Sequence, residues 1–367
     1  MVMTDQKIRK SISGTTPFLF DLYRQYNGDK STTMSPISIM LLMSILANGA
    51  SGETKKEIMR ALGVSGLCVQ DLNAICRTLI RELPLSISNR IDVYNRIKLS
   101  DDFINVMHDT YKATITEGLN IDGVTLVNSV RFCKKWMKAF DEEYTAVETF
   151  YGNASNENVN MMSQRDLFYY MSDKDYSAVD LPYRGSRYCM RIILPNPNVD
   201  IAKITDMLGN EMLEYIPSQM DLCEVELKIP KFRIDTDVSL SKAIQKFGAS
   251  SMFDDIKANF SNMSEAPLFV SDIRQKAYVD VNEYGTEAYA ETRCCLLGSA
   301  PDSPKYREVE FHANRPFIYM LIDECFNVII FLGQFMGIHI NIESLTTNNM
   351  KATNIYKTAV VLYNILS

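Results

Sequence analysis

The chain has 367 residues, of which 46% are hydrophobic, and a formal net charge of −7. This length and apolar content are enough for one large domain or for two ordinary ones. The acidic balance argues against nucleic acid as a partner, because proteins that bind nucleic acids present a basic surface.

The ends of the chain and its cysteines give expectations about location. The N-terminal run MVMTDQKIRKSISG is polar and lacks the apolar core of a secretory signal, so we expect a cytoplasmic protein, with non-classical secretion as an alternative. The longest apolar runs, 328–331 and 359–363, are too short for a membrane span. The eight cysteines show no metal-ligand spacing, which predicts reduced thiols, no metal site and no cofactor.

The first third of the chain is predicted to be mostly helical. Residues 16–26 carry apolar side chains at helical spacing, as an amphipathic helix does. Ser35 and Pro36 fit a helix N-cap followed by proline in the first turn, and residues 37–47 are apolar nearly all round, which predicts a buried helix. Further along we expect a short helix at 53–62, a strand at 89–99 and a helix at 101–113.

From residue 160 onward the pattern is typical of strands. The runs DLFYYMS, YSAVDLP, YCMRIILP and CEVELKIPKF are each bounded by turn residues. Residues 201–213 predict one or two helices, and 240–247 predict another. Because strands and helices are grouped without a βαβ repeat, the pattern indicates the α+β class.

The stretch from Val279 to Phe311 begins as a strand and then changes character. Val279 and Val281 alternate with polar residues, and small side chains follow with no proline until Pro301. If this run were extended, one face would be uncharged and mostly small, while the other would begin polar. A segment able to be loop or strand is a candidate bistable element. The uncharged face would carry Thr286, Ala288, Ala290, Thr292, Cys294, Leu296 and Gly298.

The run Asn282-Glu283-Tyr284-Gly285-Thr286-Glu287-Ala288 resembles the hinge of a serpin reactive-centre loop. With the Ser35-Pro36 and Phe317 regions, the resemblance covers residues 15–335. It implies an α+β serpin fold with a large central mixed or antiparallel sheet, two further sheets, about eight helices and an exposed loop. It also implies a protease inhibitor rather than an enzyme: a serine or cysteine protease cleaves the loop, and the freed hinge inserts into the central sheet.

The resemblance implies a division of the chain. Residues 1–337 would form the serpin domain, with a helix-rich part at 15–113, a sheet-rich part at 121–337 and the reactive-centre loop at 284–310. Residues 338–367 have no counterpart in the family, and we expect a disordered tail or a segment that docks on a partner.

Family roles fall on particular residues only through the resemblance. Trp136 corresponds to the breach, the top of the central sheet where insertion begins. Gln275 stands where the family usually carries histidine, and its amide can still donate and accept hydrogen bonds. The hinge residues are Glu283, Gly285, Thr286, Ala288, Ala290 and Thr292, and the shutter residues beneath the central sheet are Ser35, Pro36, Ser38, Asn128 and Gln275.

The reactive bond depends on how the loop is counted. Counting forward from Glu283 places it between Ser299 and Ala300, which would suit an elastase-like pocket. Counting back from Phe311 places it near Asp302, which would suit a protease that requires aspartate. Leu297 and Lys305 remain open for chymotrypsin-like and trypsin-like proteases.

One family element is predicted to be missing. Too few residues separate Ala113 from Leu126 to hold both the edge strand and the helix that covers the front of the central sheet. We expect exposed apolar sheet surface, and hence a monomer at risk of polymerisation. The missing helix favours an alternative, a non-inhibitory binding or storage protein or a truncated isoform that is only a protease substrate. The small, uncharged hinge face favours the inhibitor.

A catalytic site is not predicted. The three histidines, His108, His312 and His339, lie in no nucleophile or metal motif. A cysteine protease built on Cys294 or Cys295 has no signature around it.

Overall fold

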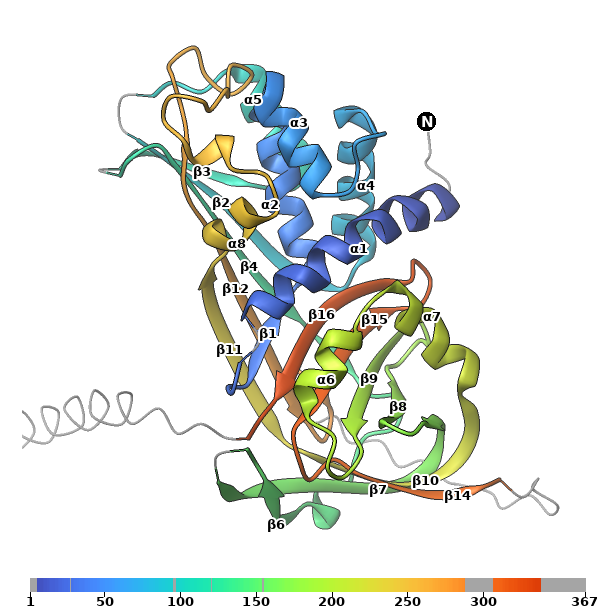
Figure 1. Ribbon diagram of the computed structural model, residues 1–367. Helices are drawn as coiled ribbons and strands as arrows, with labels where there is room; N and C mark the ends of the chain where they lie inside the picture. The colour runs from blue at the N-terminus through green and yellow to red at the C-terminus, as the bar shows by residue number, and fades with distance from the viewer. Residues whose placement is uncertain are drawn as a thin grey trace, which may run out of the picture. The chain divides into compact units, whose positions relative to one another are not determined.

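The structure is a computed structural model that describes residues 5–26, 28–94, 97–119, 121–153, 155–287 and 306–337. All of these belong to one compact unit, Met1–Gly337, and the predicted C-terminal extension, 338–367, lies outside the described residues. This unit is α+β, as the sequence predicts (Figure 1). Within the described ranges, no helix is long and apolar enough to cross a membrane.

Eight α-helices occur among the described residues. Their bounds follow from local signals: Ser35 Oγ accepts a hydrogen bond from the Ser38 N–H at 3.4 Å, and Pro36 occupies the first turn of α2. The one or two helices predicted at 201–213 are two, and the second continues to Gln219. The helices are α1 (Asp5–Tyr26), α2 (Pro36–Gly49), α3 (Gly52–Ala61), α4 (Val69–Glu82), α5 (Asp101–Tyr111), α6 (Ile201–Met207), α7 (Asn210–Gln219) and α8 (Ser241–Lys246).

The central sheet has seven strands and is mixed. Its order is β3-β2-β4-β12-β13-β5, and β11 pairs with β12 at the side. The pairs β2–β3 and β4–β12 are parallel, and the others are antiparallel. The strands are β2 (Leu85–Tyr94), β3 (Thr114–Leu119), β4 (Val124–Phe132), β5 (Lys134–Lys135), β11 (Phe232–Ser239), β12 (Val270–Asn282) and β13 (Gly285–Thr286).

The remaining strands form one nine-stranded sheet of order β1-β16-β15-β9-β8-β7-β10-β14, with β6 paired to β7. Where the resemblance implies two sheets, the 17-residue strand β7 (Asn156–Ser172) is shared by both and joins them. The others are β1 (Thr32–Met34), β6 (Ala146–Tyr151), β8 (Tyr176–Pro182), β9 (Tyr188–Pro195), β10 (Asp221–Pro230), β14 (Glu308–His312), β15 (Phe317–Asp323) and β16 (Val328–Phe335).

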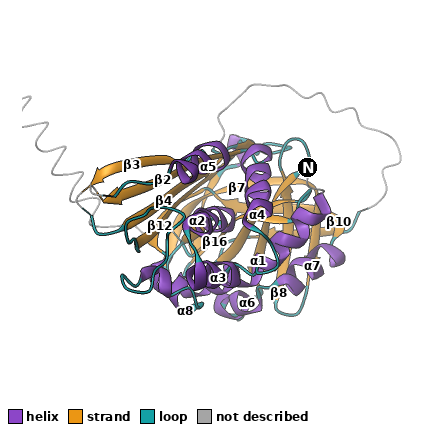
Figure 2. Ribbon diagram, turned by 90° about the horizontal axis from the view of Figure 1, so that it is seen from above, coloured by secondary structure: helices purple, strands orange, loops and turns teal. Residues whose placement is uncertain are grey.

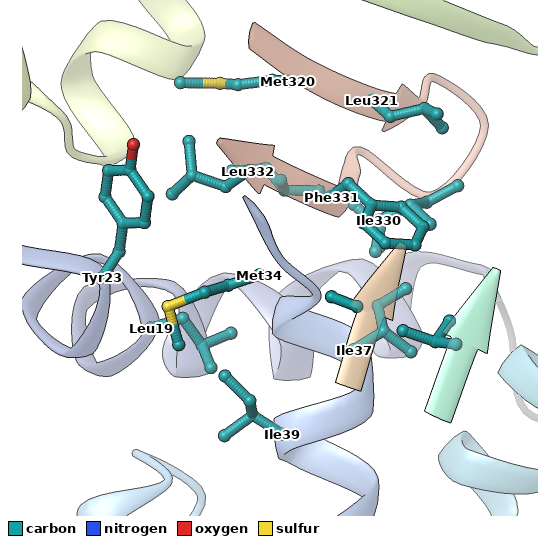
Figure 3. Close-up of a cluster of buried hydrophobic side chains, with 14 of the residues drawn as sticks. Leu19, Tyr23, Met34, Ile37, Ile39, Met320, Leu321, Ile330, Phe331 and Leu332 are labelled. Atoms are coloured by element: carbon teal, nitrogen blue, oxygen red, sulfur yellow. The ribbon is translucent and has the colours of Figure 1, made fainter. Parts of the chain in front are cut away.

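Helix α2 lies in the middle of the core. It contacts β4 and β12 of the central sheet and β16 of the nine-stranded sheet, so apolar residues all round the helix are buried (Figure 2). Strands β15 and β16 are buried along their whole length, which explains their continuous apolar sequence. Figure 3 shows part of this core, in which Leu19, Met34, Ile37 and Leu332 belong to one buried cluster.

The family helix between β3 and β4 is missing, as predicted, because only residues 120–123 connect these strands. The expectation that its loss exposes apolar surface is wrong. Ser88, Ser129, Lys276 and Asp237 lie in register across four strands on the uncovered front face. In the next row Tyr278 interacts with two arginines, Arg131 and Arg233, whose guanidinium carbons lie 5.1 and 4.8 Å from the ring centroid. This face can therefore remain in water, which removes the apolar basis expected for polymerisation.

Candidate functional site at the hinge, breach and shutter

Strands β4 and β12 are paired over part of their length and separated beyond it. They pair directly, in parallel, up to Arg131 and Tyr278. Further along, the two residues of β13 lie between β12 and β5, the short strand that follows β4 in the chain. Gly285 pairs with Asn282 of β12 and with Lys135 of β5. The first part of the predicted hinge therefore already forms a short middle strand, and Thr286 points inward and is fully buried.

Trp136 lies where the strands separate. Its indole Nε1–H donates to the Asn282 carbonyl oxygen at 2.9 Å, and its backbone N–H donates to the Tyr284 carbonyl oxygen at 2.9 Å. The indole stacks on Tyr183 with ring centroids 4.4 Å apart, and the Tyr183 hydroxyl lies 2.5 Å from Thr286 Oγ1. The only tryptophan of the chain thus contacts both sides of the hinge turn.

Glu283 fixes the turn between β12 and β13. Its carboxylate accepts hydrogen bonds from Lys231 Nζ at 2.8 Å and from Thr145 Oγ1 at 3.0 Å, and its carbonyl oxygen accepts from the Phe140 N–H at 2.8 Å. Burial alone would raise the pKa of Glu283, but hydrogen bonds from Lys231, the backbone and Thr145 outweigh it and hold the pKa below its usual range.

The lowered pKa of Glu283 predicts an acid-sensitive hinge. A carboxyl group with a depressed folded-state pKa stabilises the fold above its unfolded value of 4.5, and this contribution is lost as the pH falls through the folded-state pKa. Trp136 fluorescence, which reports on the residues either side of Glu283, should therefore change below pH 4.5. We expect Glu283→Gln to remove this change and to lower the free energy of unfolding at pH 7 by about 1–2 kcal/mol. An unchanged acid titration in the variant would contradict the assignment.

Glu287 ends the inserted segment. Its φ of 48° lies in the left-handed region, which turns the chain out of the sheet. Its N–H donates to the Asp280 carbonyl oxygen at 2.8 Å, and its own carbonyl oxygen accepts from Cys133 Sγ at 2.8 Å. Burial raises the pKa of Glu287, opposed by the nearby Arg131 guanidinium.

The polar side chains of the candidate shutter are divided between β4 and β12, which are neighbours in the central sheet. Gln275 of β12 bonds the backbone of Ser35: its Oε1 accepts from the Ser35 N–H at 3.0 Å, and its Nε2 donates to the Ser35 carbonyl at 2.8 Å. Asn128 of β4 instead donates to Asn89 Oδ1 of β2 at 2.8 Å. Asn128 and Gln275 are direct neighbours in the sheet, but among the described residues their side chains do not bond to each other's partners. The Gln275 side chain bonds Ser35, while that of Asn128 bonds Asn89 of β2. Separating β4 from β12 therefore breaks backbone bonds without breaking this network.

Two buried shutter atoms have no hydrogen-bond partner among the described residues, Asn128 Oδ1 and Ser38 Oγ. An orphaned buried acceptor is costly, and such an atom is a natural partner for a hydroxyl group that arrives later.

The structure brings most predicted residues into two groups. Ser35, Pro36, Ser38, Asn128 and Gln275 are buried together beneath the sheet, while Trp136, Glu283, Gly285 and Thr286 lie together at its upper opening. The remaining predicted residues lie outside the described residues: Ala288, Ala290 and Thr292 of the hinge, and Leu297, Ser299, Ala300, Asp302 and Lys305 near the reactive bond.

Sequence reasoning did not find the residues that support these groups. Tyr183 contacts the site from just after β8, Lys231 from the connection between β10 and β11, and Asn89 from β2. Their sequence signals are weak because each is a single polar residue within or beside an ordinary strand. Only the packing of strands distant in sequence gives them a role.

One group of side chains has the composition of a metal site, namely Asp180, Cys189 and Glu324. Both Asp180 oxygens already accept from Arg191, at 2.8 and 2.7 Å. Burial also raises the pKa of the Cys189 thiol well above its usual value, which disfavours the thiolate that binds metals. These residues fit an ion-pair network better than a metal centre.

The comparisons with known proteins all point to one family. The family profile described as "Serpin (serine protease inhibitor)" matches residues 13–122 and 119–338, so the two matched stretches meet at the short β3–β4 connection. The leukocyte elastase inhibitor of Xenopus tropicalis is 28% identical over 380 residues, covering 88% of this chain and 98% of that protein. An uncharacterised serpin-like protein of Methanosarcina acetivorans is 28% identical over 364 residues, covering 86% of this chain and 85% of that protein.

Solved structures show the same fold. The crystal structure of the thermophilic serpin tengpin in its native state superposes with a TM-score of 0.80 at 24% identity, and covers 90% of this chain and 94% of that chain. The residues matched by the family profile include the candidate hinge, breach and shutter residues described above. The chain belongs to the serpin family.

Proposed function

We propose that this chain inhibits a serine or cysteine endopeptidase by the serpin mechanism. The protease nucleophile attacks a loop carbonyl carbon, an acyl bond to the protease forms, and the peptide bond breaks as its nitrogen leaves with a proton. The freed hinge then inserts between β4 and β12 and carries the acylated protease with it. The position of Gly285 and Thr286 between β5 and β12 is the observation that best supports this proposal.

The register of β13 supports further insertion without a shift. Thr286 pairs with Val281 of β12 and with Lys134 of β5. The sequence separation between Val281 and Lys134 equals that between Gln275 and Asn128, which are direct neighbours where β12 and β4 pair. Continuing this register brings each later inward residue between one residue of β4 and one of β12. Ala288 would lie between Phe132 and Val279, Ala290 between Val130 and Ala277, and Thr292 between Asn128 and Gln275.

The inward side chains suit the positions that this register gives them. Ala290 would meet Val130 and Ala277, which are buried and apolar. Thr292 would bring a hydroxyl donor next to Asn128 Oδ1, the buried acceptor without a partner. The inserted strand would therefore satisfy an atom that the uncleaved form leaves unsatisfied.

The outward side chains would meet the polar front face of the sheet. Glu291 would lie beside Lys276, and Tyr289 beside Tyr278. Arg293 would lie beside Arg274, an unfavourable pair that is weakened by solvent on this exposed face. Because the covering helix is missing, no element has to move aside for these contacts.

A competing function is a serpin-like protein that proteases cut without being trapped, which the missing helix favours. Incubation with pancreatic elastase, chymotrypsin, trypsin and a granzyme, followed by a denaturing gel, separates the two. For the inhibitor we expect a covalent band that survives SDS with at least one of these enzymes, and N-terminal sequencing of the released fragment identifies the bond. Fragments without such a band, from every enzyme that cuts the loop, would leave only the substrate function.

We further propose that the protein acts in a reducing compartment such as the cytoplasm. Six described cysteines, Cys68, Cys76, Cys133, Cys189, Cys223 and Cys325, are free thiols. Disulfides are the rule in oxidising compartments, so this set of free thiols supports the proposal.

A further inference from the structure

A surface pocket of about 550 Å³ is formed where three connections meet, and none of its lining residues belongs to the hinge, breach or shutter. The connections are residues 151–153 at the end of β6, residues 195–201 between β9 and α6, and residues 315–316 just before β15. Strand β6 and helix α6 are labelled in the lower part of Figure 1. The volume lies in the range typical of small-molecule sites.

Arg315 contributes a half-buried positive charge to this pocket. Its Nε–H donates to the Pro195 carbonyl oxygen at 2.8 Å, which fixes the orientation of the guanidinium group. Its Nη1 reaches Asn314 Oδ1 only at 3.4 Å, and among the described residues no carboxylate lies within ion-pair distance.

A comparison with two other arginines shows that this charge is unusual. Burial lowers the pKa of Arg191 and Arg187, but the carboxylates of Asp180 and Asp323 outweigh burial and raise it overall. Burial lowers the pKa of Arg315 without any such compensation. A partly desolvated cation without a counter-ion is stabilised by any anion that reaches it.

The rest of the lining is part apolar and part polar. Apolar surface comes from Pro195, Val199, Ile201 and Pro316, and from the exposed ring of Tyr151. Among the described residues, the amides of Asn153 and Asn198 and the Tyr151 hydroxyl form no hydrogen bond. The acid in the lining, Asp200, accepts from the Ala202 N–H at 2.8 Å and so caps α6.

We propose that this pocket binds a small organic carboxylate, whose carboxylate pairs with the free edge of the Arg315 guanidinium and whose apolar body lies against Pro195, Pro316 and Tyr151. Arginine suits this role because its planar fork of donors matches the two oxygens of a carboxylate. The binding site is separate from the inhibitor function proposed above and does not rest on it.

Nuclear magnetic resonance titration of the full chain tests this inference. The probes are benzoate, its neutral analogue benzamide and inorganic phosphate. We expect saturable shifts with benzoate and none with benzamide. Arg315→Gln should weaken benzoate binding at least tenfold, while Lys203→Gln, a change on α6 outside the pocket, should leave it unchanged because Lys203 pairs with Asp175 at 2.8 Å.

A second variant keeps the test decisive if loss of the Arg315–Pro195 bond disturbs the fold. Asn198→Asp adds a negative charge to the lining, and aspartate tolerates the left-handed φ of 72° at this position. We expect it to weaken benzoate binding at least threefold. The proposal is overturned if benzoate gives no saturable shifts, if neither pocket variant weakens its binding, or if phosphate binds as tightly as benzoate.

Discussion

Replacing Thr286 by arginine is expected to abolish covalent trapping while leaving cleavage of the loop intact. Thr286 is fully buried between β5 and β12, and its hydroxyl lies 2.5 Å from that of Tyr183. In the uncleaved chain the two residues of β13 can leave the sheet and keep an arginine in water, whereas full insertion would bury its unpaired charge. A penalty of about 3 kcal/mol on insertion corresponds to a loss of roughly a hundredfold. Insertion would then lose to hydrolysis of the acyl bond.

The measurement is the ratio of SDS-stable complex to cleaved product, with Thr286→Ser as the matched control that retains the hydroxyl. Circular dichroism checks that both variants fold. Melting after cleavage gives a second readout, because insertion raises the melting temperature. If the arginine variant formed as much stable complex as the serine variant, an inserted Thr286 would not be required for inhibition.

Replacing Gln275 by leucine is expected to lower the free energy of unfolding by about 2–4 kcal/mol. The Ser35 N–H would lose its partner while fully buried, and the Ser35 carbonyl would keep only the bond from the Ile39 N–H at 3.2 Å. The cost comes from the orphaned backbone groups, since leucine fills nearly the same volume as glutamine.

Urea denaturation measures this effect as a shift of the midpoint at constant slope. Lys276→Met is the control, because Lys276 is the adjacent residue of β12 and its exposed side chain points to the opposite face. We expect the control to change stability by less than about 0.5 kcal/mol. A Gln275→Leu variant as stable as the control would show that the bonds to Ser35 do not hold the shutter together.

The polar front face shows how an expectation taken from the family can hide a plain sequence pattern. Residues 85–94 place Ser86, Ser88 and Arg90 at alternate positions, which is the pattern of a strand with one face in water. Strand β4 does nearly the same with Thr125, Ser129 and Arg131, and Val127 is the one apolar residue among these alternate positions. The alternation already predicts a face that needs no cover, but the expectation of a covering helix led us to infer an apolar one.

The sequence by itself determined the elements and the division of the hinge into a small, uncharged face and a polar one, because both depend on local periodicity. Period 2 from Thr286 onward groups the small side chains on one face, and the cap at Ser35 starts α2. That this face points inward follows only from the turn at Glu283 and Tyr284, which pairs Thr286 with Val281. Only the tertiary structure decided the contacts of Glu283 with Lys231 and of Asn128 with Asn89, and the extent of β13 between its neighbours. These features join strands far apart in the chain, so local spacing carries no information about them.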